Sequence, residues 1–364
     1  MGKKSKIILT GGHLAPLLAV YEVLSKKASC VVVGRRHTFE ADKTESLEYT
    51  LFKKENIPFY NLPAARLQRK FTKHTIPSLF RSPSAFIRAR SVLSHERPDV
   101  ILTFGGYIGL PVALAAYVKG IPIVLHEQTL RAGLTNRTIG KIATKICISY
   151  PTSARFFPSE KTVVTGNPVR PEVFTIYDSL KLPAGLPVLY VTGGSAGAHA
   201  LNTIIEYILP NLLRNFVVIH QTGDAQEFKD YERLTKLKEN LPEDLRDRYV
   251  LKKFILPKEI GWVYKQADVI LSRSGANTVA ELIALHKKAL LIPLPFGQQE
   301  EQLENAKYYE STNLGEYILQ KNVNLNTIIK KLLSIRESKI PPMPPFKNDA
   351  AEKIAQEVFS VLVK

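Results

Sequence analysis

The chain has 364 residues, 45% of them hydrophobic and 23% charged, which excludes a disordered or low-complexity protein. Its length suggests about two domains, at roughly 100–200 residues each. The formal net charge of +17 favours an anionic partner such as a nucleotide, a nucleic acid or an acidic membrane surface, although a basic protein without such a partner is the simpler alternative.

Targeting and membrane-spanning signals are absent from the sequence. The apolar run at residues 7–9 is too short for a signal peptide. No stretch approaches the ~20 uninterrupted apolar residues of a transmembrane helix. Cys30 and Cys147 are the only cysteines and form no disulfide framework, which favours a reducing, cytosolic setting.

The first half of the chain alternates short apolar runs with helical patterns. Strands are expected at residues 6–9, 30–33, 99–104, 122–125, 145–149 and 162–165, and helices at residues 14–26 and 109–119. Repeated strand, turn, helix and strand indicate βαβ units and a parallel sheet.

Residues 64–97 have a different character, because eight Lys and Arg residues there face a single acid, Glu96. Bulky apolar residues such as Phe71, Phe80 and Ile87 lie between them. This mixture suits an anionic membrane interface. The alternatives are a solvated helix pair, about equally supported, and a site for single-stranded nucleic acid, which is weaker.

The αβ pattern restarts after the proline-containing stretch 171–187. Strands are expected at 188–191, 216–220, 250–254, 267–271 and 289–292, with helices at 201–213, 230–247, 257–266, 278–285, 298–311 and 325–334. Four prolines at 341–345 stiffen a linker before a last amphipathic helix at 349–363. Two successive αβ halves predict a two-lobed enzyme with ligand-binding turns after its strands.

Four turns that follow strands are candidates for phosphate binding. Three are rich in glycine, at residues 10–13, 105–107 and 193–197, and the fourth, 274–276, precedes a helix. A helix N-terminus presents unpaired N–H groups and a partial positive charge to an anion. Glu281 follows at a distance from which a carboxylate reaches a ribose hydroxyl. The simpler reading is an ordinary turn that Ser274 caps, with glycines needed only for backbone geometry.

His13 directly follows Gly11 and Gly12 at the start of a helix. A helix N-terminus disfavours the imidazolium ion, so the neutral ring is available as a general base. The alternative is a histidine that only hydrogen-bonds a neighbouring strand. The sequence has no HExxH, CxxC or Asp-x-Asp pattern, so no metal and no cofactor are expected.

A set of short motifs in a fixed order resembles the MurG family of N-acetylglucosaminyltransferases over nearly the whole chain. The motifs are Thr10-Gly11-Gly12-His13, Gly105-Gly106-Tyr107, His126-Glu127-Gln128, Ala132-Gly133-Leu134-Thr135-Asn136, Gly166-Asn167-Pro168-Val169-Arg170, Gly193-Gly194-Ser195-Ala196-Gly197-Ala198 with Leu201-Asn202, His220-Gln221-Thr222-Gly223, residues 273–281, and Gln302 with Asn305-Ala306. Thr129 departs from the family pattern, which usually has Asn there.

The resemblance implies an α/β fold of the GT-B type, with two Rossmann-like, doubly wound domains and a cleft between them. Residues 1–168 would bind the undecaprenyl-linked acceptor at the anionic inner membrane surface. Residues 169–345 would bind UDP-N-acetylglucosamine, and the helix in 346–364 would pack back on the N-terminal domain. The implied reaction is inverting, metal-independent transfer to the 4-hydroxyl of N-acetylmuramic acid on the cytoplasmic face of the membrane, without nucleic acid.

The same resemblance assigns the site residues. His13 is the expected catalytic base. The expected donor-binding residues are Thr10, Gly11, Gly12, Thr129, Arg170, Ser195, Ile255, Ala276, Asn277, Thr278, Val279, Ala280, Glu281 and Gln302. The expected acceptor and loop residues are Gly105, Gly106, Tyr107, Glu127 and Asn136.

Other functions remain open from the sequence alone. A diacylglycerol glycosyltransferase or a UDP-sugar 2-epimerase would use the same scaffold. A non-catalytic, membrane-bound UDP-sugar sensor would keep the binding turns without activity.

Overall fold

The computed structural model describes residues 4–11, 14–36, 47–62, 75–177, 181–194, 197–223, 227–295 and 301–362. The chain divides into two compact units. Unit 1 comprises Met1–Arg170 and Lys347–Lys364, and unit 2 comprises Pro171–Phe346. The C-terminal segment therefore returns to the unit in which the chain begins.

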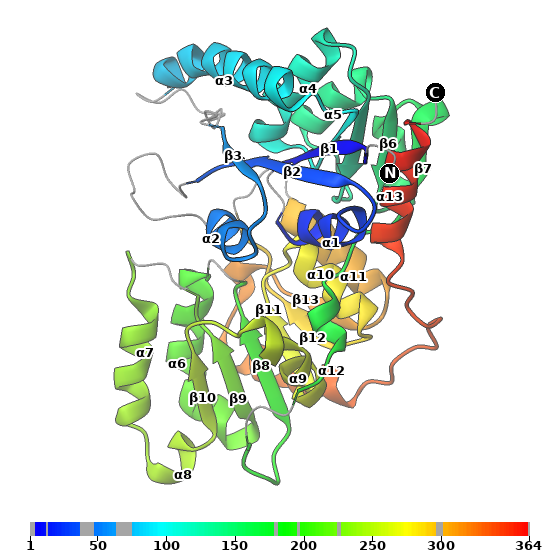
Figure 1. Ribbon diagram of the computed structural model, residues 1–364. Helices are drawn as coiled ribbons and strands as arrows, with labels where there is room; N and C mark the ends of the chain where they lie inside the picture. The colour runs from blue at the N-terminus through cyan, green and yellow to red at the C-terminus, as the bar shows by residue number, and fades with distance from the viewer. Residues whose placement is uncertain are drawn as a thin grey trace. The chain divides into compact units, whose positions relative to one another are not determined.

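Unit 1 is built on a seven-stranded parallel sheet with the order β3-β2-β1-β4-β5-β6-β7 (Figure 1). Its strands are β1 (Lys6–Thr10), β2 (Ser29–Gly34), β3 (Phe59–Asn61), β4 (Val100–Thr103), β5 (Ile123–Glu127), β6 (Lys145–Ile148) and β7 (Thr162–Val164). The strand order reverses direction next to β1, where β2 and β4 both pair with it. Ligands of doubly wound sheets bind at the carboxyl ends of strands near such a reversal.

Helices cover both faces of this sheet, as Figure 1 shows. The helices α3 (Thr75–Glu96), α4 (Gly106–Val118) and α5 (Leu134–Ile142) bury one apolar cluster with residues such as Ile8 and Ile101. The helices α1 (Leu14–Leu24), α2 (Leu47–Lys54) and α13 (Ala350–Ser360) bury the other with Ile7 and Leu9. Because both faces are buried, the strands are continuously apolar rather than alternating.

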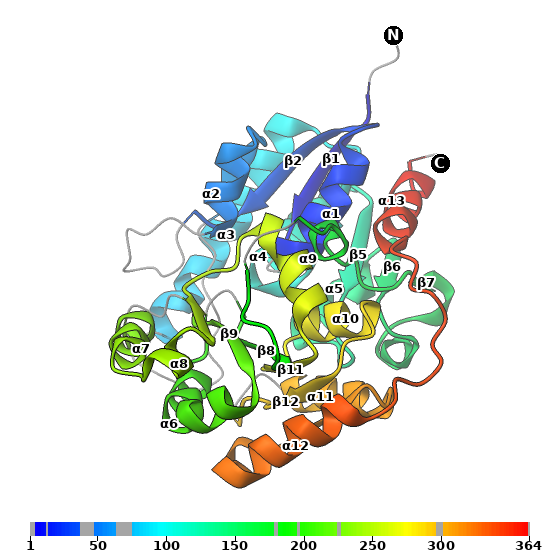
Figure 2. The ribbon, with the colours of Figure 1, turned by 90° about the horizontal axis from the view of Figure 1, so that it is seen from below.

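Unit 2 has a six-stranded parallel sheet with the order β10-β9-β8-β11-β12-β13. The strands are β8 (Val188–Thr192), β9 (Val217–Gln221), β10 (Tyr249–Lys252), β11 (Val269–Ser272), β12 (Ala289–Leu291) and β13 (Gly315–Tyr317). Its helices are α6 (His199–Asn215), α7 (Asp230–Glu239), α8 (Glu243–Arg246), α9 (Pro257–Gln266), α10 (Ala276–Ala284), α11 (Glu301–Ser311) and α12 (Leu325–Glu337). In Figure 2, α6 and α12 lie on one side of this sheet and α9 and α10 on the other.

The structure corrects the sequence expectation at several elements. A single helix over residues 230–247 is wrong, because α7 ends at Glu239 and α8 begins after Pro242. Proline has no N–H to donate within a helix and restricts the residue before it, so the chain turns there. The sequence also gave no sign of α2, α5, β3 or β13, which are short. Within residues 64–97, the structure describes one long helix, α3, from Thr75.

None of the helices that the structure describes is both long enough and apolar enough to cross a membrane.

Candidate functional site

Gly11 directly follows β1 and has a conformation that only glycine adopts readily. Its φ is +140°, and a Cβ atom there would lie 2.8 Å from Cβ of Phe104. The N–H of Phe104 donates to the carbonyl of Thr10 at 2.7 Å. The chain after β1 therefore lies directly against the chain after β4. The Oγ1 atom of Thr10, at the same place, is buried and has no hydrogen-bond partner.

Gly105 brings the turn after β4 against α5. Its φ is +73°, and a Cβ atom would lie 1.7 Å from Oδ1 of Asn136, so no side chain fits. The same Oδ1 atom accepts from the N–H of Gly106 at 3.3 Å. Tyr107 follows in the first turn of α4, and its hydroxyl accepts from Nη1 of Arg35 at 2.7 Å. The predicted acceptor residues Gly105, Gly106, Tyr107 and Asn136 therefore form one connected group.

Glu127 is the centre of a buried hydrogen-bond network at the end of β5. Its Oε1 atom accepts from the N–H of Thr129 at 2.8 Å and from the Thr129 hydroxyl at 2.7 Å. Its Oε2 atom accepts from Nδ2 of Asn136 at 2.9 Å. Burial raises the pKa of the Glu127 carboxyl, and these donors oppose the rise. The carboxylate and the Thr129 hydroxyl thus hold the loop together, which is a structural use of two predicted ligand-binding side chains.

The turn between β11 and α10 leaves a helix N-terminus open in unit 2. Gly275 is the N-cap residue, and as a glycine it has no side chain to accept from the first N–H groups of α10. The interpretation of Ser274 as the cap is wrong, because the N-cap is Gly275, and the hydroxyl of Ser274 donates to the carbonyl of Gln302 at 2.7 Å. A side chain on Gly275 would meet nothing within 4 Å. The start of α10 is therefore a candidate anion site, because the N–H groups in the first turn of a helix have no partner within the helix.

Helix α10 places the remaining predicted donor residues. Ala276, Val279 and Ala280 are buried, whereas Asn277 and Thr278 are half-buried. Glu281 is buried more than one turn into the helix, and its Oε2 atom accepts from the Tyr264 hydroxyl at 2.7 Å.

Gln302 links α11 to two neighbouring turns. In addition to the bond from Ser274, its Oε1 atom accepts from the N–H of Leu294 at 3.1 Å. Asn305 donates from Nδ2 to the carbonyl of Ser274 at 3.1 Å. The predicted Gln302 therefore lies beside the turn that precedes α10.

The ends of β8, β9 and β10 meet at the side chain of Gln221. Its Nε2 atom donates to the carbonyl of Gly194 at 3.1 Å, and its Oε1 atom accepts from the N–H of Ile255 at 3.3 Å. Ile255 is a predicted donor residue, and Gly194 adjoins Ser195. Sequence reasoning assigned no role to Gln221, although its position in the motif His220-Gln221-Thr222-Gly223 was a signal.

For some of the predicted site residues the structure gives few or no contacts. Gly12, His13 and Ser195 lie outside the described residues. Arg170 is half-buried at the end of the first segment of unit 1. Over the described ranges, no three His, Cys, Asp or Glu side chains converge as metal ligands would.

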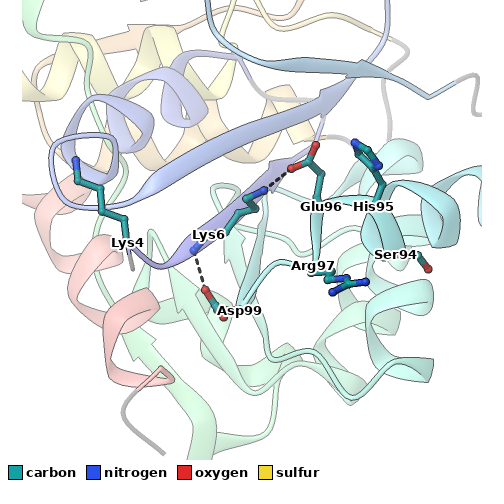
Figure 3. Close-up of a pocket in the computed structure, with 7 residues that line it drawn as sticks. All are labelled: Lys4, Lys6, Ser94, His95, Glu96, Arg97 and Asp99. Carbon is teal, nitrogen blue, oxygen red and sulfur yellow. Dashed lines mark hydrogen bonds and ion pairs between the residues drawn. The ribbon is translucent and has the colours of Figure 1, made fainter. Parts of the chain in front are cut away.

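A hollow of about 440 Å³ lies at the opposite, amino edge of the unit 1 sheet (Figure 3). Lys6 spans it, with its Nζ atom 2.8 Å from Oε2 of Glu96 and its N–H donating to Oδ2 of Asp99 at 2.7 Å. In Figure 3 the side chains of Lys4, His95 and Arg97 point in different directions. These groups fasten the start of β1 to the end of α3, and they do not converge on a ligand.

Comparisons with known proteins agree with this arrangement. Residues 8–148 match the glycosyltransferase family 28 N-terminal domain, and residues 188–358 match the glycosyltransferase family 28 C-terminal domain. The chain is 30% identical to a Clostridium botulinum protein named UDP-N-acetylglucosamine--N-acetylmuramyl-(pentapeptide) pyrophosphoryl-undecaprenol N-acetylglucosamine transferase, over 99% of both chains. It is 32% identical to a protein of the same name from Lawsonia intracellularis, over 97% of this chain and 95% of the relative.

Solved structures show the same fold. The crystal structure of Acinetobacter baumannii MurG matches with a TM-score of 0.69 at 24% identity, over 98% of this chain and 99% of the other. A UDP-GlcNAc 2-epimerase from Neisseria meningitidis, bound to UDP-GlcNAc, matches with a TM-score of 0.67 at 14% identity, over 98% and 100%.

Two doubly wound units, matched by the N- and C-terminal domains of glycosyltransferase family 28, define a glycosyltransferase of the GT-B fold. The chain belongs to glycosyltransferase family 28.

Proposed function

We propose that this protein transfers N-acetylglucosamine from UDP-N-acetylglucosamine to N-acetylmuramyl-(pentapeptide) pyrophosphoryl-undecaprenol, the step that the names of its relatives describe. The observation that supports this most is the likeness to proteins of that name over 99% of the chain. The open N-terminus of α10 provides the physical basis, because the leaving group of this reaction is a nucleoside diphosphate.

The donor would bind at the carboxyl edge of the unit 2 sheet. Main-chain N–H groups at Ala276, Asn277 and Thr278 would face the diphosphate, and the partial positive charge of α10 would stabilise the charge that develops as UDP departs. Glu281, which Tyr264 holds in place through a hydrogen bond to Oε2, would accept from the ribose hydroxyls. Ser195, Ile255, Gln302 and Arg170 would complete the donor contacts.

The acceptor would bind at the carboxyl edge of the unit 1 sheet. There Gly105, Gly106 and Tyr107 follow β4, with Asn136 of α5 against them. Thr10, Gly11 and Gly12, at the end of β1, keep their predicted role as donor contacts. His13 would remove the proton from the 4-hydroxyl of the muramyl sugar. The oxygen would then attack the anomeric carbon opposite the bond to the β-phosphate oxygen, that bond would break, and the configuration would invert.

Helices α3 and α4 offer a surface for the membrane on which the acceptor resides. They lie side by side in unit 1 (Figure 1) and expose the apolar side chains of Ile87, Tyr117 and Val118. Arg88, Arg90 and Lys119 are exposed on or next to the same helices. Apolar insertion combined with basic residues suits peripheral attachment to an anionic inner leaflet.

The test is a transfer assay with a lipid-linked muramyl-pentapeptide acceptor and a panel of UDP-sugars. We expect turnover with UDP-N-acetylglucosamine and this acceptor, and little with UDP-glucose or with diacylglycerol as acceptor. Consumption of UDP-N-acetylglucosamine without any acceptor would instead indicate an epimerase. UDP binding with no transfer to either acceptor would contradict an enzymatic role.

A further inference from the structure

The carboxyl edge of unit 2 contains a buried amide, Gln221, that touches three strand ends and for which the proposed function has no role. We propose that Gln221, supported by Asn202, is a positioning residue that fixes the donor-binding turns of unit 2. This inference rests on the proposed donor site, and it concerns how that site acquires its shape.

Gln221 uses its amide on the backbone of two different turns. As a donor, its Nε2 atom holds the carbonyl of Gly194, in the glycine-rich turn after β8, at 3.1 Å. As an acceptor, its Oε1 atom takes the N–H of Ile255, after β10, at 3.3 Å and the hydroxyl of Tyr190 at 3.2 Å. Gln221 is itself the last residue of β9. One side chain therefore joins the ends of three adjacent strands.

Asn202 holds the next residue of the same turn from the other side. Its Nδ2 atom donates to the carbonyl of Thr222 at 3.1 Å and to Oδ2 of Asp230 at 2.7 Å. Because both partners are pure acceptors, the orientation of the Asn202 amide is fixed.

The fixed orientation of the Asn202 amide also determines the tautomer of the buried His220. Oδ1 of Asn202 lies 3.1 Å from Nε2 of His220, which must therefore bear the hydrogen. Nδ1 of His220 then accepts from the Tyr249 hydroxyl at 2.8 Å. The network that runs from Tyr249 to Thr222 thus has a single arrangement of donors and acceptors.

The Thr222 carbonyl lies directly against Gly197, in the glycine-rich turn after β8, and leaves no room for a side chain there. A Cβ atom on Gly197 would lie 2.4 Å from this oxygen, so the turn packs directly on it. Gly197 has a φ of +77°, which glycine adopts without strain. Gln221 therefore holds Gly194 directly, and Asn202 holds the Thr222 carbonyl on which Gly197 packs.

Because of this arrangement, loss of the Gln221 side chain should weaken donor binding and leave the rate of the chemical step unchanged. Gln221 is 7% exposed and acts on the ligand only through the backbone that it holds. Losing it leaves the carbonyl of Gly194 and the N–H of Ile255 without their buried partner, and each unmade bond costs the free energy of an unsatisfied group. The two turns would then sample positions that fit UDP less well, whereas the acceptor turns of unit 1 would be unchanged.

The experiment compares Gln221→Met, Gln221→Glu and Tyr309→Phe in the full-length protein. Methionine keeps the volume of glutamine and loses every hydrogen bond. Glutamate keeps the acceptor oxygen for Ile255 and loses the bond to Gly194. Tyr309→Phe is the matched control, because its buried hydroxyl donates to the carbonyl of Lys287 at 2.5 Å, at the amino edge of the same sheet.

We expect Gln221→Met, which loses all three hydrogen bonds, to raise the dissociation constant for UDP and the KM for UDP-N-acetylglucosamine roughly five- to thirtyfold. The acceptor KM and kcat should stay within about twofold, and Gln221→Glu should fall between Met and the wild type. Tyr309→Phe should lower the melting temperature without changing UDP affinity.

Unchanged UDP affinity in Gln221→Met would overturn the inference, as would an equal loss of affinity in Tyr309→Phe. If Gln221→Met fails to fold, Gln221→Glu gives the same comparison with one bond lost. Failure of the wild type to transfer any sugar would instead contradict the proposed function, while UDP binding would still test the role of Gln221.

Discussion

The hydroxyl of Ser274 donates to the main-chain carbonyl of Gln302, 2.7 Å away, and the N-cap of the helix that follows is Gly275. Ser274 therefore fastens α11 to the turn before α10 and leaves the N-terminus of α10 uncapped. A serine before a helix is normally read as an N-cap. Here the N-cap is the glycine after it, which has no side chain and so leaves the helix N-terminus available to a ligand.

Replacing Ser274 with alanine should therefore weaken the contact to α11 without creating a capping defect. We expect a loss of about 0.5–1.5 kcal/mol in the free energy of unfolding, because a part-buried hydrogen bond to the carbonyl of Gln302 is lost. UDP affinity should fall as well. Ser311→Ala removes an exposed hydroxyl bond within α11 itself and serves as the control. A wild-type free energy of unfolding in Ser274→Ala would contradict this account.

Gly105→Ala should be severely destabilising. The new Cβ atom would overlap Oδ1 of Asn136 at 1.7 Å, and alanine is strained at a φ of +73°. We expect a loss of at least about 2 kcal/mol in chemical denaturation, together with weaker acceptor binding. Gly133→Ala is the matched control, because a Cβ atom there meets nothing within 4 Å and its φ is −65°. Equal effects of the two substitutions would show that crowding at Asn136 is not the cause.

The stability of the protein should depend on pH through His220. Complete burial lowers the pKa of this histidine from its ordinary 6.5 to about 3. The unfolded state therefore binds a proton more readily than the folded state between these values. It follows that the free energy of unfolding should fall as the pH drops from 6.5 towards 3. Denaturation of the wild type and of His220→Gln across this range tests the point, and the variant should show a shallower pH dependence. Parallel curves would exclude His220 as the source.

Binding to anionic vesicles should depend on the exposed apolar residues of α4. Tyr117→Ser with Val118→Ser removes two side chains that are 59% and 63% exposed. We expect vesicle affinity to fall about tenfold or more, because each side chain contributes roughly 1–2 kcal/mol when it is buried in the membrane. Tyr207→Ser is the control, since Tyr207 is 80% exposed on α6 of unit 2. Undiminished vesicle binding by the double variant would place the membrane surface elsewhere.

Much of the fold was predictable because parallel strands that are buried on both faces are continuously apolar. The strands β1, β2, β4 and β8 were expected within one or two residues of their observed bounds. The edge strands β3 and β13 were missed, because each has three half-buried residues and neither forms a distinct apolar run. The break between α7 and α8 follows from Pro242 itself, because proline disfavours a helical residue before it.

The site was predictable only in part, for a physical reason. Glycines that must adopt a positive φ, such as Gly105, stand out in a sequence. Hydrogen-bond partners do not stand out, because they can lie far apart in the sequence. Gln221 and Ile255, for example, are 34 positions apart. The sequence predicted that Ser274 and Thr129 lie near ligands. In the structure, the hydroxyl of Ser274 donates to Gln302 and that of Thr129 donates to Glu127.

The central claim is that unit 2 holds a nucleoside diphosphate on the main-chain N–H groups at the start of α10. A crystal structure of the protein soaked with UDP tests it most directly. The account predicts density for the diphosphate within hydrogen-bond distance of the N–H groups of Ala276, Asn277 or Thr278, with the ribose beside Glu281. Diphosphate density at any other place on the protein would contradict it.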